Sequence, residues 1–120
     1  MLIFTSNYSK ISRRDTSDLL LIRISSSRPD WFTKEHVTLP ELYPDWDLVT
    51  GYKEGRYTEE QYTEKYSQKL TDELKESVRN KIQQLLNDSG KGKAVLLCWC
   101  GGFCHRHIVN NWLDGNGELY

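Results

Sequence analysis

Three short hydrophobic runs stand out along the chain, at residues 2–8, 19–24 and 94–98. Each has the length of a strand and is rich in leucine, isoleucine or valine, which is typical of strands buried on both faces of a parallel sheet. The first run turns polar at its end, as a strand does when it finishes at a ligand-facing edge. The second run is followed by three serines and Arg28-Pro29, which indicate a break between elements. The pattern therefore predicts three parallel strands with their polar ends at one edge of a sheet.

Helical spacing begins after the second run. Thr58 and Gln61 fit a capping box, in which each side chain bonds the other residue's backbone N–H. Tyr62, Tyr66 and Leu70 then follow at intervals of four residues, which places them on one face of a helix. We expect this stripe of tyrosines to pack in the core rather than to bind a ligand.

A second helix is expected to restart at Thr71 or Asp72 and to end near Gly90, because glycine readily adopts the left-handed conformation that closes a helix. A last helix is expected at residues 104–113, directly after the third strand. Strands that alternate with helices predict an α/β fold. We expect a single domain over residues 1–120, with an open, mostly parallel, Rossmann-like sheet and flanking helices.

The segment between residues 30 and 57 is aromatic and irregular. Pro40 and Pro44 argue against long regular elements there. We expect this segment to pack as a flap on an edge of the sheet. The exposed tryptophans and tyrosines of such a flap would also suit a contact surface for another molecule.

Composition narrows the classes of function. Lys and Arg number 16 against 17 Asp and Glu, for a formal net charge of -1, which argues against binding to duplex nucleic acid through bulk charge. No run approaches the roughly 18 apolar residues of a membrane span, and the first apolar run is too short for the core of a signal peptide. We expect a cytoplasmic protein without a membrane partner. The sequence does not fix an oligomeric state.

The three cysteines, Cys98, Cys100 and Cys104, lie close together. An odd number in one cluster makes a poor disulfide framework, so we expect reduced thiols. Cys98 lies in an apolar strand and is expected to be a small core residue. Cys104 lies near the start of a helix, where the helix dipole stabilises a thiolate. It is the candidate reactive cysteine.

The loop between the third strand and the last helix is the main candidate site, because ligands of parallel sheets bind beyond the carboxyl ends of the strands. A helix N-terminus at this place favours anions. Gly101 and Gly102 let the backbone approach a ligand closely, with Cys100 beside them. Arg106 can recognise a phosphate or carboxylate with two hydrogen bonds. His105 is a candidate partner for the thiol of Cys104.

Two residues of neighbouring strand ends, Asn7 and Arg23, are expected to line the same pocket. A buried arginine needs a partner, although Arg23 could also point into solvent at the end of its strand.

Two sharper interpretations compete with an anion pocket. Cys98, Cys100, Cys104, His105 and His107 are all ligand types that bind zinc, but their spacing lacks the two separated pairs of a usual structural zinc site. Cys100 and Arg106 also form a C-x5-R pattern between a strand and a helix, as in cysteine-dependent phosphatases. In those enzymes a serine or threonine normally follows the arginine, whereas this chain has His107.

The chain resembles the domain-of-unknown-function family numbered 488 (DUF488). One matching stretch runs from the third strand through Cys98 and the Cys104-His105-Arg106 triplet to Trp112-Leu113. Another runs from Leu42-Tyr43-Pro44 through Tyr52-Lys53 to the helix that begins at Thr58. Arg23 and the polar end of the first strand match as well. The resemblance implies an open, Rossmann-like α/β fold and, by analogy, a role connected with nucleotides or nucleic acids.

This sequence departs from the family pattern at one position. The family commonly has a glutamate two residues after the strand cysteine, where this chain has Cys100. The C-x5-R pattern is therefore not a family feature. The change removes a carboxylate that could serve as a base or an orienting group.

The leading hypothesis is an α/β protein that binds or processes a phosphate-bearing small molecule, such as a nucleotide, without a predicted cofactor. In this hypothesis Arg106, Gly101, Gly102 and Arg23 hold the ligand, and Cys104 with His105 forms the reactive pair. The alternatives are a non-catalytic interaction or sequestering protein that uses its aromatic flap, a zinc-binding protein, and a cysteine-dependent phosphatase. Whether the protein is an enzyme stays open at this point.

Overall fold

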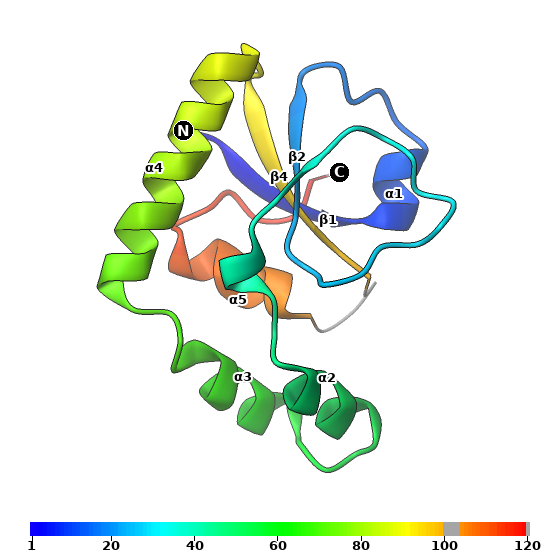
Figure 1. The fold of residues 1–120 in the computed structure, drawn as a ribbon, viewed down its shortest axis with the longest axis vertical. Helices are drawn as coiled ribbons and strands as arrows, with labels where there is room; N and C mark the ends of the chain where they lie inside the picture. The colour runs from blue at the N-terminus through cyan, green and yellow to red at the C-terminus, as the bar shows by residue number, and fades with distance from the viewer. Residues whose placement is uncertain (100–103, 120) are drawn as a thin grey trace.

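The computed structural model describes residues 1–99 and 104–119, which build an open parallel sheet with helices around it (Figure 1). Four strands pair in the order β1-β4-β2-β3, and every pair is parallel. The strands are β1 (Ile3–Asn7), β2 (Leu19–Arg23), β3 (Val37–Thr38) and β4 (Lys93–Cys98). The predicted α/β class and open, Rossmann-like sheet are confirmed.

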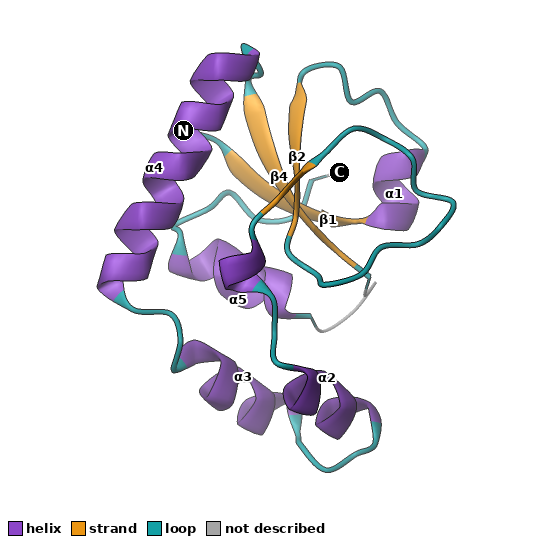
Figure 2. Ribbon diagram, viewed as in Figure 1, coloured by secondary structure: helices purple, strands orange, loops and turns teal. Residues whose placement is uncertain are grey.

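The helices connect the strands. They are α1 (Tyr8–Ser12), the 3-10 turn η1 (Pro40–Leu42), α2 (Trp46–Lys53), α3 (Glu59–Ser67), α4 (Asp72–Ser89) and α5 (His105–Trp112). The helices α2 and α3 lie toward the end of the sheet at which β2 and β4 finish (Figure 2). They therefore stand over the edge where a parallel sheet carries its ligands.

Local sequence signals explain where three helices begin or end. The Thr58 Oγ1 atom accepts from the Gln61 N–H at 3.1 Å, and the Gln61 side chain accepts from the Thr58 N–H at 2.9 Å, so the predicted capping box forms. Gly90 closes α4 with a φ of 71°. Asn7 caps α1 by accepting from the Lys10 N–H at 2.8 Å.

The sheet is buried on both faces, which explains why its strands are almost continuously hydrophobic. One face, with Ile22 and Leu96, packs against α4 and α5, and the same cluster takes in the buried residues of α3. The other face packs against α1 and the following loops and includes Tyr8, Leu21 and Phe32. Tyr62 and Tyr66 belong to the first cluster, so the tyrosine stripe of α3 is in the core as predicted.

The segment between residues 30 and 57 is more regular than its prolines suggested. It contains the edge strand β3, the turn η1 and the two-turn helix α2. Pro40 stands at the start of η1, and Pro44 precedes α2, which are positions where the missing N–H of proline is tolerated. Among the described helices, none is long and apolar enough to cross a membrane.

Candidate functional site

A cleft of about 490 Å³ opens at the carboxyl edge of the sheet. Its floor is formed by Cys98 at the end of β4 and by Cys104 and His105 at the start of α5. The remaining wall residues come from the loop after β2, from the loop before α2, and from α2, α3 and the residue after β4: Ser25, Ser26, Ser27, Pro44, Trp46, Val49, Tyr52, Lys53, Tyr62 and Trp99. The described wall therefore contains four aromatic rings, one cation and no carboxylate.

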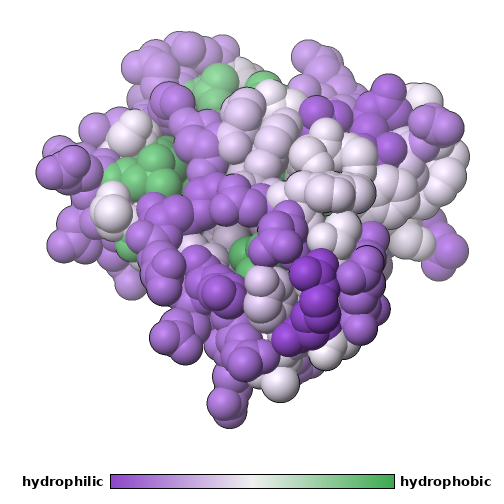
Figure 3. Space-filling model, turned by 60° about the horizontal axis from the view of Figure 1, so that its bottom comes forward, coloured by the Kyte–Doolittle hydropathy of each residue, from purple (hydrophilic) through white to green (hydrophobic). Residues whose placement is uncertain are grey.

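The aromatic residues give the cleft its apolar character. Figure 3 turns the lower end of the molecule forward, and strongly hydrophobic residues reach this surface only in a few separate spots. Val49 and Pro44 are the aliphatic residues of the described wall, whereas Trp46 and Trp99 are 74% and 52% exposed. Two accessible tryptophans at one cleft offer flat apolar surfaces to a ligand.

Trp99 is held in place by the loop that follows β2. Its indole N–H donates to the Ser27 carbonyl at 3.0 Å and lies 3.2 Å from the Ser27 hydroxyl. The ring also contacts Tyr8 edge to face, at a centroid distance of 5.8 Å. Tyr8 is fixed in turn by a 2.5 Å hydrogen bond to Ser25. The position of Trp99 is therefore set before any ligand arrives.

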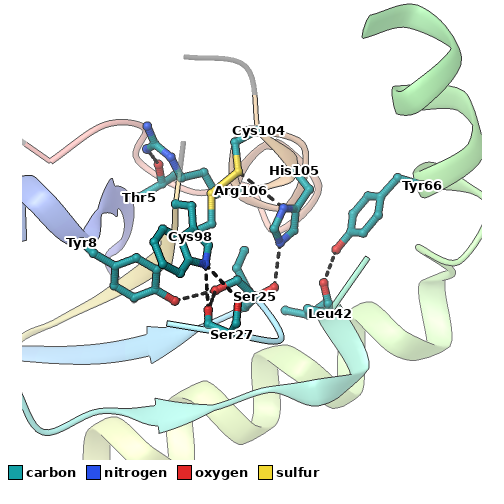
Figure 4. Close-up of a disulfide and its surroundings, with 12 residues drawn as sticks. Thr5, Tyr8, Ser25, Ser27, Leu42, Tyr66, Cys98, Cys104, His105 and Arg106 are labelled. Carbon is teal, nitrogen blue, oxygen red and sulfur yellow. Dashed lines mark hydrogen bonds between the residues drawn. A yellow bond between two sulfur atoms is a disulfide. The ribbon is translucent and has the colours of Figure 1, made fainter. Parts of the chain in front are cut away.

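A disulfide joins Cys98 and Cys104 on the floor of the cleft, with an S–S distance of 2.03 Å (Figure 4). The expectation of reduced thiols is wrong for these two cysteines in this structure. The cysteines are six positions apart, and Cys98 ends β4 whereas Cys104 stands directly before α5, so the disulfide joins the strand end to the helix start. Counting cysteines did not reveal this pairing, because it depends on how the strand and the helix lie in space.

His105 approaches the disulfide from the first turn of α5 and is only 4% exposed. Its Nε2 atom lies 2.7 Å from the carbonyl oxygen of Ile24, and its Nδ1 atom lies 3.4 Å from the Cys104 Sγ atom. A carbonyl only accepts, so Nε2 must carry the proton. Burial lowers the pKa of His105 to about 4, against the opposing effect of the Ile24 hydrogen bond, so the ring is neutral at pH 7. Its Nδ1 lone pair therefore faces the sulfur.

Arg106 points away from the cleft, toward Thr5 (Figure 4). Its guanidinium is 1% exposed, donates to the Thr5 hydroxyl and forms an ion pair with Glu118 at 2.8 Å. Arg106 is absent from the described wall of the cleft. In this structure Arg106 links α5 to β1 and to the C-terminal segment. The sequence predicted instead that Arg106 binds a phosphate.

The other predicted binding residues lie around the cleft or outside the described residues. Asn7 caps α1, and Arg23 is half-buried and donates to the Tyr43 hydroxyl at 3.2 Å. Neither belongs to the described wall. Cys100, Gly101 and Gly102 lie outside the described residues. Of the predicted site residues, the structure brings Cys104 and His105 into the cleft.

Most of the wall was missed by sequence reasoning. The sequence pattern indicates a break between elements at the serines after β2. It indicates a contact surface on a flap at Trp46 and Tyr52. Trp99 and Lys53 were not assigned a role, although Lys53 belongs to a matched family motif. The signal that could have found them is position, because residues directly after parallel strands meet at the carboxyl edge.

The fold is that of an open α/β protein of the Rossmann-like kind, with a cleft at the carboxyl edge of its sheet. Residues 3–117 match the family model described as the active DUF488-N3 subclade, so the chain belongs to the DUF488 family. A search of curated proteins and a search of solved structures each found no match.

Proposed function

We propose that the protein binds a nucleotide or a nucleotide-like ligand in the cleft and acts on it at the floor. The observation that carries this proposal is the composition of the wall, in which aromatic rings, serine hydroxyls and one lysine meet without a described carboxylate. A flat base, a sugar and a phosphate need these three kinds of partner. The volume of about 490 Å³ lies in the range of small-molecule sites.

Trp46 and Trp99 are the proposed stacking partners of the base. Stacking on an aromatic side chain is worth about 1 to 3 kcal/mol per base and tolerates any base, because every base has a π-face. Trp99 is held by Ser27 and Tyr8, so little side-chain entropy would be lost on binding. This supports a base at the mouth of the cleft.

Lys53 replaces Arg106 as the proposed partner of the phosphate. It is the one cation of the described wall and stands at the end of α2. The hydroxyls of the loop after β2 can donate to sugar or phosphate oxygens. This arrangement keeps the phosphate near the mouth and directs the rest of the ligand toward the floor.

The floor supplies the groups for chemistry. Cys104 and His105 are the predicted reactive pair and both belong to the described lining of the cleft, and we propose that the pair acts once the disulfide to Cys98 is reduced. The matching family model is described as an active subclade, which agrees with a reacting site rather than a passive one.

Removing a tryptophan of the cleft tests the proposed stacking. A panel of nucleoside mono-, di- and triphosphates is titrated into the native protein by calorimetry. We expect W46A and W99A each to weaken binding of the best nucleotide by about 5- to 150-fold. W31A is the matched control, because Trp31 is 57% exposed and does not belong to the described wall. Unchanged affinity in W46A and W99A, or no nucleotide bound by the native chain, would overturn the proposal.

Replacing Lys53 with methionine tests the proposed phosphate contact. We expect K53M to weaken nucleotide binding by about 2- to 5-fold, because an exposed ion pair is worth little in water. The loss should grow with the number of phosphates and shrink at high salt, while the affinity for the free nucleoside stays the same. K65M is the control, since Lys65 is exposed and lies outside the described wall. An equal loss for nucleoside and nucleotide contradicts the assignment.

A further inference from the structure

Three buried donor groups meet on the floor of the cleft. The Sγ atoms of Cys98 and Cys104 and a ring nitrogen of His105 all lie within 4.8 Å of one another, and each residue is at most 4% exposed. Among the described residues, this is the one group of three or more histidines, cysteines and carboxylates close enough to share an ion. His107, which the sequence offered as a ligand, does not belong to it.

His105 is oriented as a metal-binding histidine normally is. In metal sites, the ring nitrogen that does not bind the ion donates its proton to a carbonyl or a carboxylate, which fixes the other nitrogen toward the metal. Here Nε2–H donates to the Ile24 carbonyl at 2.7 Å. The lone pair of Nδ1 then points at the sulfur of Cys104, 3.4 Å away. In the disulfide this sulfur carries no proton, so it cannot donate a hydrogen bond to Nδ1.

We propose that Cys98, Cys104 and His105 bind one Zn²⁺ ion when the disulfide is reduced, and that the fourth position of the ion opens into the cleft. A thiol reductant supplies two electrons and two protons, which cleave the S–S bond to two thiols and leave the reductant as its own disulfide. The ion then replaces the two thiol protons, which pass to solvent, and forms two Zn–S bonds and one Zn–N bond. The disulfide is the oxidised, metal-free form of the same site.

The distances suit this assignment. In a tetrahedral site with Zn–S bonds of about 2.3 Å and a Zn–N bond of about 2.05 Å, the nitrogen and a sulfur lie about 3.5 Å apart. The observed separation of Nδ1 and the Cys104 Sγ atom is 3.4 Å. Two sulfurs on one zinc lie about 3.7 Å apart. The Cα atoms of the two cysteines are 7.4 Å apart, so the sulfurs can separate by side-chain rotation.

The ligand set selects the kind of ion. Thiolates and an imidazole suit zinc, whereas magnesium and calcium require oxygen ligands, which the cluster lacks. A zinc ion with two thiolates and a neutral imidazole has no net charge, which lowers the cost of placing it in a buried site. The spacing of the cysteines in the sequence did not favour zinc, but their positions in space do.

An open fourth position would give the cleft a Lewis acid. Zinc sites with three protein ligands hold water or substrate in the fourth position, and they polarise a carbonyl or phosphoryl oxygen or activate the bound water. Cys98, Cys104 and His105 all line the cleft, so this position would face a bound ligand. The zinc site does not depend on the ligand proposed above, and its test uses no nucleotide.

Metal content of the full chain tests the proposal. The protein is reduced with a dithiol under anaerobic conditions, dialysed against Zn²⁺ and freed of excess ion, and zinc is measured by elemental mass spectrometry. We expect about one zinc per chain in the reduced protein and less than a tenth of this in the oxidised protein. With Co²⁺ in place of Zn²⁺, we expect thiolate-to-cobalt charge-transfer absorption. Zinc near zero in the reduced protein would overturn the proposal.

Variants assign the ligands. C98S, C104S and H105A should each lower zinc affinity by at least 10-fold, whereas H36A should not, because His36 lies outside the cluster. Equal zinc affinity in all four variants would overturn the assignment. A measurement on the reduced wild-type chain gives the same test without relying on variants that fail to fold. There Zn²⁺ should slow alkylation of Cys98 and Cys104 by at least 10-fold, with the sites mapped by mass spectrometry. Alkylation at an unchanged rate would also overturn it.

Discussion

Replacing Arg106 with methionine is expected to lower the free energy of unfolding by about 3 kcal/mol. The guanidinium is 1% exposed and bonds both the Thr5 hydroxyl and the Glu118 carboxylate. Methionine fills much of the space but leaves Glu118, which is 15% exposed, without its main partner. An uncompensated charge in such a place is costly, although partial access to water keeps the cost toward the low end. Urea unfolding followed by circular dichroism measures the loss.

R56M is the matched control for R106M. Arg56 also pairs with carboxylates, those of Asp47 and Glu54, but its side chain is 51% exposed. Exposed ion pairs contribute about 0 to 1 kcal/mol, so R56M should unfold within about 1 kcal/mol of the native protein. If R106M is as stable as R56M, then Arg106 does not hold the fold together. The ligand role predicted from the sequence would then become the better explanation.

The pH dependence of stability separates the ion pair from simple packing. Burial raises the pKa of Glu118, but the hydrogen bond from Arg106 and the charges of Arg106 and Lys10 outweigh it, so the pKa is lowered overall. A carboxyl whose pKa is lowered in the folded state stabilises the fold above its unfolded value of about 4.3. This stabilisation is lost as the pH falls through the folded pKa. The acid-induced loss should be smaller in R106M than in the native protein.

The sequence predicted the scaffold well because its signals are local. Three hydrophobic runs marked β1, β2 and β4 nearly to the residue, and the capping box at Thr58 marked the start of α3. Gly90 marked the end of α4. The weak elements were missed. The edge strand β3 has two residues and α1 has five, which is too short for a periodic pattern to emerge.

The site was harder to predict, because its members come together through turns and long-range contacts. Sequence reasoning placed Cys104 and His105 correctly at a strand–loop–helix junction. It predicted a phosphate contact for Arg106, and nothing local shows that Glu118, twelve positions later, accepts a hydrogen bond from the same side chain. The serines after β2 and the rings of α2 belong to one cleft only after the chain has folded. The positions of these residues follow from contacts between distant parts of the chain, which residue type alone does not reveal.

The geometry of the cleft floor also depends on contacts between residues far apart in the sequence. The Ile24 carbonyl directly after β2 fixes the tautomer of His105, and the start of α5 lies beside the end of β4, where Cys104 meets Cys98. Both effects need the parallel pairing of β2 with β4. The positions of Cys98, Cys104 and His105 therefore depend on the sheet. Substitutions that loosen the packing beside these residues should alter the orientation of the groups on the cleft floor.

We expect substitution of Tyr66 to loosen the packing beside the cleft floor the most. Its ring is 1% exposed, contacts the His105 ring at a centroid distance of 5.4 Å and stacks on Tyr62, which lines the cleft. Its hydroxyl donates to the Leu42 carbonyl at 2.6 Å. Burial, followed by the neighbouring Tyr62, raises the pKa of Tyr66 well above its ordinary value. The hydroxyl therefore remains a neutral donor across the pH range of the experiments.

We expect Y66A to lower the free energy of unfolding by about 4 kcal/mol, because it leaves a cavity beside His105 and removes a buried hydrogen bond. Y66F should lower it by about 1 to 2 kcal/mol, since it removes only the hydroxyl and leaves the Leu42 carbonyl without this donor. Y57F is the control, because the Tyr57 hydroxyl bonds the exposed side chain of Asp47, and its removal should cost less than about 1 kcal/mol. Chemical denaturation measures all three variants.

The two Tyr66 variants also separate packing from hydrogen bonding at the floor of the cleft. Y66F keeps the ring against His105, so zinc content and nucleotide affinity should stay within about 2-fold of the native values. In Y66A the imidazole loses its packing on this side and gains freedom to turn, so both properties should fall at a temperature where the variant is still folded. A Y66A protein that keeps both at native levels would show that the Ile24 hydrogen bond alone orients His105. Equal losses in Y66F and Y66A would instead assign the orientation to the Tyr66 hydroxyl and its hold on Leu42.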